Sequence, residues 1–144
     1  MLLELAAPAS LPIGIAPVNR QPALLALTLQ HPPVHLEAQA RDGLHITGPR
    51  AHIAHTFADR VYAHHAYGPG AEIEIELAIP AAMGLGSDGL LALGVAQALA
   101  WAHAIPDTTP PTLAQALALS AAHAGEVAGY AHGGLLLVQP AGSE

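Results

Sequence analysis

Residues 78–89 read Ala78-Ile79-Pro80-Ala81-Ala82-Met83-Gly84-Leu85-Gly86-Ser87-Asp88-Gly89. Before them, Glu72, Glu74 and Glu76 alternate with apolar residues, which predicts a strand with one buried face. After them, an almost wholly apolar stretch predicts a buried helix over residues 87–103. A loop of small residues at the start of a helix can direct several backbone N–H groups at one anion, backed by the helix dipole. The stretch therefore predicts a phosphate-binding loop between a strand and a helix.

Composition narrows the classes of protein that fit. The chain of 144 residues predicts one domain. Its formal net charge is −7 and its only basic residues besides histidine are four scattered arginines, so we expect no nucleic-acid partner, which would need clustered cations. The absence of cysteine excludes disulfides and thiolate sites. Because the sequence has neither a signal-peptide pattern nor an apolar run of about 20 residues, we expect a cytoplasmic protein without membrane contact.

The remaining pattern predicts an α+β fold, with helices on one face of a mixed, largely antiparallel sheet. Two early strands are expected to pair, a turn at His31-Pro32-Pro33 separates the next two, and a fifth forms a hairpin with the strand before it. Thr112 is expected to cap the third helix. The expected strands are 2–6, 11–16, 23–29, 34–40, 44–47, 72–79 and 135–138, and the expected helices are 51–65, 87–103 and 113–124.

The loop has rival interpretations. Gly84, Gly86 and Gly89 have the spacing of a dinucleotide-binding loop, but an antiparallel region precedes them and Asp88 would lie in the pyrophosphate site. A Walker A loop is excluded because the chain has no lysine. A turn whose glycines serve only tight packing stays an alternative.

The pattern Pro80-x-x-x-Gly84-Leu85-Gly86-Ser87 resembles the phosphate-binding motif of the GHMP kinase superfamily. Within that superfamily, residues 78–87 are most similar to the β-ribofuranosylaminobenzene 5′-phosphate synthase (beta-RFAP synthase) branch. Residues 5–14 resemble the opening segment of this branch, and residues 131–138 resemble its later strand with a glycine pair. The resemblance implies the N-terminal α+β domain of these kinases, which is like domain 2 of ribosomal protein S5.

The resemblance also implies a function. In the synthase branch the loop would bind phosphoribosyl pyrophosphate, usually with Mg²⁺, and the phosphoribosyl group would pass to a 4-substituted benzoate in methanopterin biosynthesis. The alternatives are an ATP-dependent small-molecule kinase and a non-catalytic subunit that binds a phosphorylated ligand. The resemblance places the phosphate or nucleotide at Pro80, Gly84, Leu85, Gly86, Ser87 and Asp88, and a substrate contact at His132, Gly133 and Gly134. It identifies no catalytic residue.

Two departures from the superfamily carry expectations of their own. Asp88 stands where the kinases carry a second serine, so its carboxylate either repels phosphate, ligates a bridging metal, or caps the helix. The chain matches only the first of two domains. We therefore expect residues 1–144 to be one N-terminal domain, without the C-terminal domain, working as a partial unit or with a second polypeptide.

Two further groups of residues have alternative interpretations. His52, His55 and Asp59 share one face of the expected first helix, either as metal ligands or as an ordinary polar face. Arg20 lies between early strands, where it either meets a phosphate or is a plain surface residue.

Overall fold

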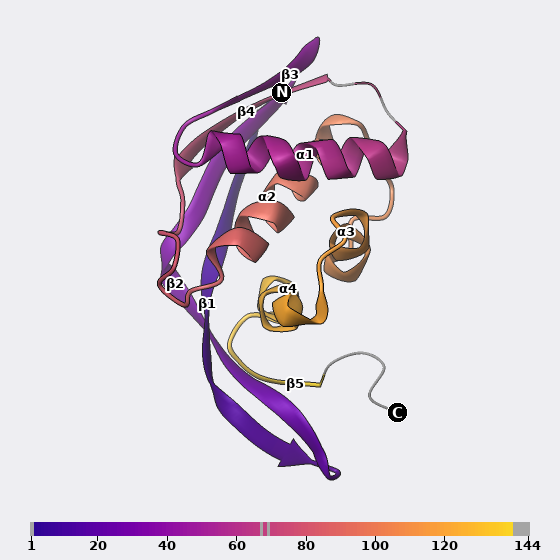
Figure 1. Cartoon of the computed structure of the whole chain (residues 1–144). Helices are drawn as coiled ribbons and strands as arrows, with labels where there is room; N and C mark the ends of the chain where they lie inside the picture. Colours follow the sequence, from indigo (N-terminus) through magenta and orange to yellow (C-terminus); the bar gives the residue numbers. More distant parts are fainter. Residues whose placement is uncertain (1, 67, 69, 140–144) are drawn as a thin grey trace.

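The computed structural model describes residues 2–66, 68 and 70–139. In this part of the chain, a five-stranded sheet has the order β1-β2-β4-β3, with β5 beside β2, and helices cover one face of it (Figure 1). The α+β prediction is therefore confirmed. The strands are β1 (Leu3–Val18), β2 (Gln21–Ala40), β3 (Gly43–Thr47), β4 (Gly70–Leu77) and β5 (Leu135–Val138); the helices are α1 (Ala51–His65), α2 (Ser87–Ala102), α3 (Pro110–Ala116), the short 3-10 helix η1 (Ala121–His123) and α4 (Ala124–His132).

Strands β1 and β2 form one long antiparallel hairpin, so the prediction of four short strands in this region is wrong. The segments 2–6 and 11–16 do not pair with each other, because residues 3–6 and 11–16 both belong to β1. The prolines at 32 and 33 lie within β2 rather than in a turn. A register shift accommodates them: Ala7 pairs with Val34 but Ala9 pairs with Leu29, so residues without a backbone N–H fall outside the regular ladder.

Strand β4 separates β2 from β3, which corrects the predicted hairpin between β2 and β3. β3 pairs with β4 in parallel, and β4 pairs with β2 in antiparallel register. The physical reason is burial, because the apolar side chains of Ile73 and Ile75 are buried and give β4 a central place. The glutamates that alternate with them lie on the outer face.

Helix α2 forms the centre of the core, as its apolar sequence predicts. Leu90, Leu91 and Leu93 are buried among residues of the sheet and of the other helices. Gly94 faces the sheet, since a Cβ there would lie at van der Waals distance, 3.4 Å, from Leu36 Cδ2. No helix in the described ranges is long and apolar enough to cross a membrane.

The expected helix over 113–124 is broken. α3 ends at Ala116, Ala118 has a positive φ of 53°, and α4 begins at Ala124, so the sequence analysis missed α4. Thr109, rather than Thr112, is the N-cap residue of α3. The two prolines occupy the first positions of the helix, where a missing N–H leaves no helical hydrogen bond unmade.

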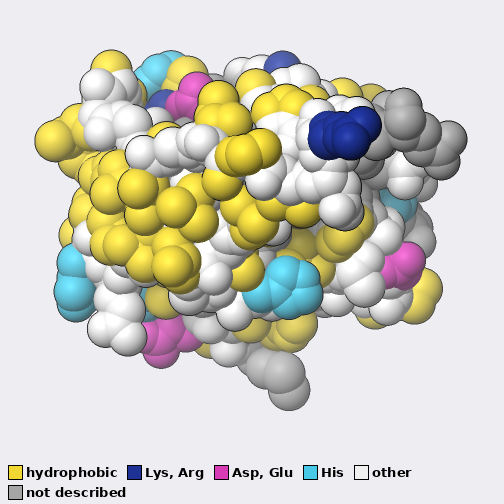
Figure 2. Space-filling view, turned by 90° about the horizontal axis from the view of Figure 1, so that it is seen from below, with side chains coloured by type: hydrophobic (Ala, Val, Ile, Leu, Met, Phe, Trp, Pro, Cys, Tyr) yellow, Lys and Arg dark blue, Asp and Glu magenta, His cyan; other side chains and the backbone are white. Residues whose placement is uncertain are grey.

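The hairpin end of the sheet has an apolar surface. Figure 2 views the molecule from this end and shows hydrophobic side chains over much of the face. Exposed members include Ile13 and Ile15 on β1 and Leu135 and Leu137 on β5. The helices of the described chain therefore leave these side chains uncovered.

On the outer face of the sheet, His35 bridges two carboxylates. Its Nε2 lies 2.9 Å from Glu4 Oε1 and its Nδ1 lies 2.5 Å from Glu76 Oε2. The hydrogen bond to Glu4, together with the charge of Glu76, raises the pKa of His35 against a lowering by burial. The cross-strand contacts thus join β1, β2 and β4 most strongly when the imidazole is protonated.

We expect the stability to depend on pH through His35. Because its pKa is raised in the folded chain, the stabilisation is fully present below its unfolded pKa of about 6.5 and is lost as the pH rises through the folded value. Urea unfolding at several values between pH 6 and pH 9 should show the free energy of unfolding falling with pH. His35→Gln should lose this part of the dependence; an identical pH profile in the variant would contradict the assignment.

Candidate phosphate-binding site

The glycine loop leads from the buried Ile79 into α2 and is held to the sheet by the backbone. Gly84 and Gly86 have φ values of +70° and +74°, a conformation that favours glycine. The amide of Ser10 on β1 donates to the carbonyl oxygen of Leu85 at 3.1 Å. This bond fixes the loop against β1 immediately before the helix begins.

The N-terminus of α2 presents backbone amides that the helix itself does not use. Gly86 is the N-cap residue and makes no side-chain capping bond, and the amide of Leu90 donates to its carbonyl oxygen at 3.0 Å. The amides of Ser87, Asp88 and Gly89 precede this first helical bond. Amides in this position, together with the helix dipole, suit an anion, and binding of phosphate here stays a prediction.

A carboxylate that the sequence analysis missed lies against this helix end. A Cβ at Gly86 would lie 2.6 Å from Glu126 Cγ, and a Cβ at Gly89 would lie 3.0 Å from His123 Nδ1. His123 and Glu126, which come from η1 and α4, contact each other through Nδ1 and Oε1 at 3.3 Å. The glycines of α2 therefore allow Glu126 to approach, and its side chain is only 16% exposed.

Cavities open on both sides of the beginning of α2. One of about 270 Å³ is lined by the loop glycines Gly84 and Gly86, by Ser10 and by Glu126. Another of about 310 Å³ is lined by Asp88, His123 and Arg60. The contact between His123 and Glu126 thus joins a residue of one cavity to a residue of the other.

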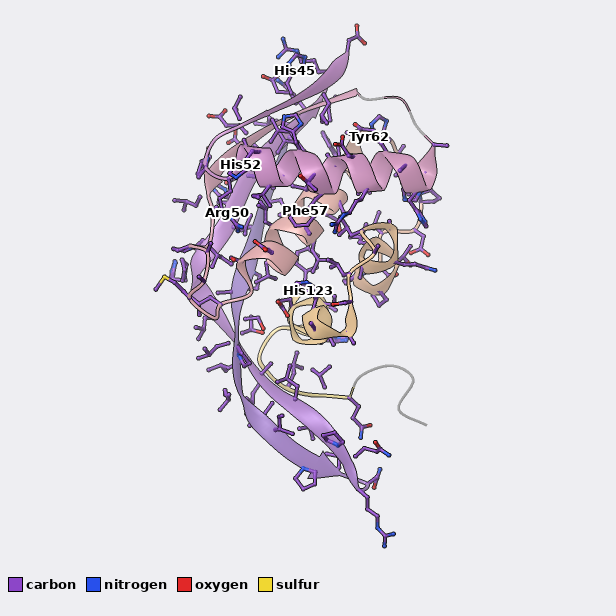
Figure 3. The ribbon with its side chains drawn as sticks, in the orientation of Figure 1. His45, Arg50, His52, Phe57, Tyr62 and His123 are labelled. Carbon is purple, nitrogen blue, oxygen red and sulfur yellow. The ribbon has the colours of Figure 1, made fainter. Side chains whose placement is uncertain are left out.

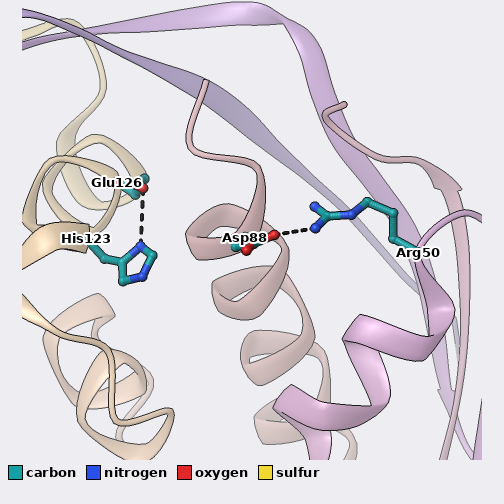
Figure 4. A network of polar contacts seen from close by, with 4 residues as sticks. All are labelled: Arg50, Asp88, His123 and Glu126. Atoms are coloured by element: carbon teal, nitrogen blue, oxygen red, sulfur yellow. Dashed lines mark hydrogen bonds and ion pairs between the residues drawn. The ribbon is translucent and has the colours of Figure 1, made fainter. Parts of the chain in front are cut away.

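Asp88 forms an ion pair with Arg50, the N-cap residue just before α1. Figure 4 shows Asp88 between Arg50 on one side and the pair of His123 and Glu126 on the other. Figure 3 likewise shows Arg50 and His123 on opposite sides of the beginning of α2. The interpretation of Asp88 as the capping residue is wrong, because Gly86 takes that position. Asp88 lies in the first helical turn, where a negative charge suits the helix dipole.

The other residues singled out in the sequence lie apart from this helix end. His132 ends α4 and lines a separate cavity of about 530 Å³ beside α3, with Ala114 among its other lining residues. The carbonyl oxygen of Gly134 accepts a hydrogen bond from the amide of Thr28 at 2.8 Å. This bond fixes the glycine pair to β2 just before β5 begins. Pro80 is an exposed residue of the loop. The contact of Pro80 with a phosphate, and of His132, Gly133 and Gly134 with a substrate, stay predictions.

Arg20 lies in the two-residue turn at the tip of the β1–β2 hairpin, where both turn residues have positive φ. Its side chain is exposed, as expected of a plain surface arginine. His52, His55 and Asp59 are on α1, and no group of three or more histidine, aspartate or glutamate side chains in the described ranges could hold a metal ion.

The residues at the start of α2 nevertheless fit the Mg²⁺ that the resemblance implies. Mg²⁺ usually binds one or two carboxylates and completes its shell with phosphate oxygens and water. Glu126 offers such a carboxylate beside an anion-binding helix end. Asp88 offers a second only if it leaves Arg50. Glu126 would therefore hold the ion, and the ion would neutralise phosphate charge.

Comparison with known families identifies the family of the chain. Residues 52–136 match the family model of the GHMP kinases N terminal domain, which covers more than half of the chain. The chain therefore belongs to the GHMP kinase family. A search of the curated proteins found no match.

Solved structures of kinases share the fold. Homoserine kinase from Cytophaga hutchinsonii is 21% identical, with a TM-score of 0.67 over 96% of this chain and 48% of that one. Phosphomevalonate kinase from Streptococcus pneumoniae is 16% identical, with a TM-score of 0.70 over 95% and 48%. Mevalonate kinase from Methanococcus jannaschii is 10% identical, with a TM-score of 0.65 over 97% and 54%. The chain thus spans about half the length of these structures.

Proposed function

We propose that this chain binds the phosphates of ATP at the start of α2 and serves as the nucleotide-binding part of a GHMP-type small-molecule kinase. The observation that carries the proposal is the N-terminus of α2, where unused amides, the loop glycines and the carboxylate of Glu126 surround one helix end. The solved structures with the same fold include kinases that act on homoserine, mevalonate and phosphomevalonate, according to their names.

In this proposal the loop and Glu126 have separate tasks. The amides of the first turn of α2 hold phosphate oxygens, and the close approach allowed by Gly86 places the Glu126 carboxylate nearby. Glu126 would hold Mg²⁺, because a carboxylate next to bare phosphate would otherwise repel it. The remaining part of the active site would come from outside residues 1–144, in a further domain or in a second polypeptide.

A second candidate is phosphoribosyl transfer from phosphoribosyl pyrophosphate, as in β-ribofuranosylaminobenzene 5′-phosphate synthase. The similarity of residues 78–87 and of the strand after Gly133-Gly134 to that branch favours it. The same helix end would then stabilise the departing pyrophosphate instead of the phosphates of ATP.

Calorimetric titration of the full chain with each ligand, with and without Mg²⁺, tests these candidates. We expect ATP to bind more tightly with Mg²⁺ by at least about tenfold, the effect of one charge-assisted contact. Glu126→Gln should remove this gain, whereas the matched control Glu74→Gln, on the outer face of β4, should keep it. Tighter binding of phosphoribosyl pyrophosphate would favour the second candidate, and the absence of binding to either ligand would overturn both.

A further inference from the structure

Arg50 differs from the other basic residues of the chain in what it contacts. The sequence has no lysine and only four arginines, all of which the structure describes. Arg50 is the arginine that forms an ion pair with the first turn of α2. The other three make different contacts: Arg20 lies at the hairpin tip, Arg41 pairs with Glu72 at 3.0 Å, and Arg60 lines the cavity beside Asp88 but donates to the carbonyl oxygen of Leu117 at 3.3 Å.

The two members of the ion pair differ in exposure. The side chain of Arg50 is 17% exposed, whereas that of Asp88 is 58% exposed. The guanidinium is therefore held in place by its surroundings, and the carboxylate can rotate into water at little cost in burial. This asymmetry allows the aspartate to leave while the arginine stays.

The guanidinium also has a donor that the described residues leave unused. Nη2 binds Asp88, but Nη1 is buried and has no hydrogen-bond partner within residues 2–66, 68 and 70–139. A buried donor without an acceptor costs free energy, so such a group calls for an explanation. Because Nη1 is buried, the atom open to exchange is Nη2, whose acceptor Asp88 is exposed. A phosphate oxygen that takes the place of the Asp88 carboxylate would accept from Nη2, since guanidinium binds carboxylate and phosphate alike.

The charges at this helix end also favour a contact between Arg50 and a phosphate. Asp88 and Glu126 both lie against the start of α2, so a phosphate arriving there meets two carboxylates. In the proposed function Mg²⁺ balances Glu126. In the free protein the positive charge of Arg50 neutralises the negative charge of Asp88, and it could neutralise the charge of a phosphate in the same way.

We propose that Asp88 is an internal counter-ion that a phosphate group of the ligand displaces from Arg50. The proposal rests on the proposed function, because it concerns a phosphate bound at the same helix end. Arg50 is then a ligand-binding residue, and Asp88 is a competitor that weakens binding. The pair would select ligands with enough negative charge to replace a carboxylate, such as a polyphosphate, over those with a single weak anion.

Two substitutions in one ion pair should have opposite effects. Asp88→Asn removes the competitor and frees Arg50, so Mg²⁺–ATP and pyrophosphate should bind about tenfold more tightly. Arg50→Met removes the cation and should weaken binding of both by about tenfold or more. If the pair only holds α1 against α2, both substitutions should weaken binding or leave it unchanged. A gain of affinity in Asp88→Asn cannot arise from damage to the fold.

The Arg41–Glu72 pair supplies matched controls on the outer face of the sheet. Arg41→Met and Glu72→Gln make the same chemical changes away from α2, so affinity should not change. Loss of affinity in both Asp88→Asn and Arg50→Met, with normal binding by the unaltered chain, would overturn the counter-ion role and leave the proposed function standing. If neither the unaltered chain nor Asp88→Asn binds either ligand, both proposals fail.

Discussion

Replacing Gly86 with valine is expected to abolish binding of Mg²⁺–ATP. Gly86 has a φ of +74°, which a β-branched residue adopts only with strain of about 1–3 kcal/mol. Its new Cβ would also lie 2.6 Å from Glu126 Cγ, so α4 or the glutamate must move. Both changes act on the groups proposed to bind phosphate and metal. Calorimetry should show affinity falling by about a hundredfold or more, equivalent to the loss of two good polar contacts.

Two other glycines separate the causes of this loss. Gly84→Ala carries the same kind of backbone strain at +70°, but its Cβ would meet no atom within 4 Å. It should therefore reduce stability and affect binding less than the Gly86 variant. Gly14→Ala on β1 has neither strain nor a close neighbour and should leave both unchanged. If the Gly86 variant binds Mg²⁺–ATP as the unaltered chain does, the ligand does not occupy this helix end.

The local part of the site could be predicted from the sequence, and the distant part could not. The glycine loop and the start of α2 are adjacent in the chain, so their pattern alone indicates an anion-binding helix end. Glu126 reaches the same point from α4, which the sequence analysis did not expect, and Arg50 reaches it from α1. One signal for Glu126 existed: it is the single acidic residue between Asp107 and Gln139 and lies between Gly125 and Gly129.

The same distinction holds for the fold. The alternating pattern of β4 identifies a strand by its period of two, and the apolar run of α2 indicates a buried helix by its length. Pairing depends on residues far apart in the chain. Prolines indicated a turn where β2 in fact continues through a register shift, and nothing local indicated that β4 would enter between β2 and β3. The pairing of the strands was therefore predicted less well than the individual helices and strands.

The position of Arg50 depends on a glycine two residues before it. Gly48 joins β3 to α1 with a φ of +103°, and its carbonyl oxygen accepts from the amide of Ala51 at 3.3 Å. The chain passes so close to β4 that a Cβ at Gly48 would lie 2.0 Å from the carbonyl oxygen of Ile75. The turn thus sets both the start of α1 and the position of Arg50, the N-cap residue before it.

Gly48→Ala is accordingly expected to be the most destabilising single substitution of those considered. Ile75 is buried and pairs with Leu36 in the middle of the sheet, so its backbone cannot move away as a flexible side chain could. We expect the free energy of unfolding, measured with urea, to fall by about 4 kcal/mol or more, a large part of the 5–15 kcal/mol typical of a domain. Gly43→Ala is the matched control, because its φ of +76° is also positive but its nearest neighbour is His45 Nε2 at 3.5 Å. It should lose only about 1 kcal/mol. Equal losses in the two variants would show that backbone conformation, and not the close approach to β4, makes Gly48 necessary.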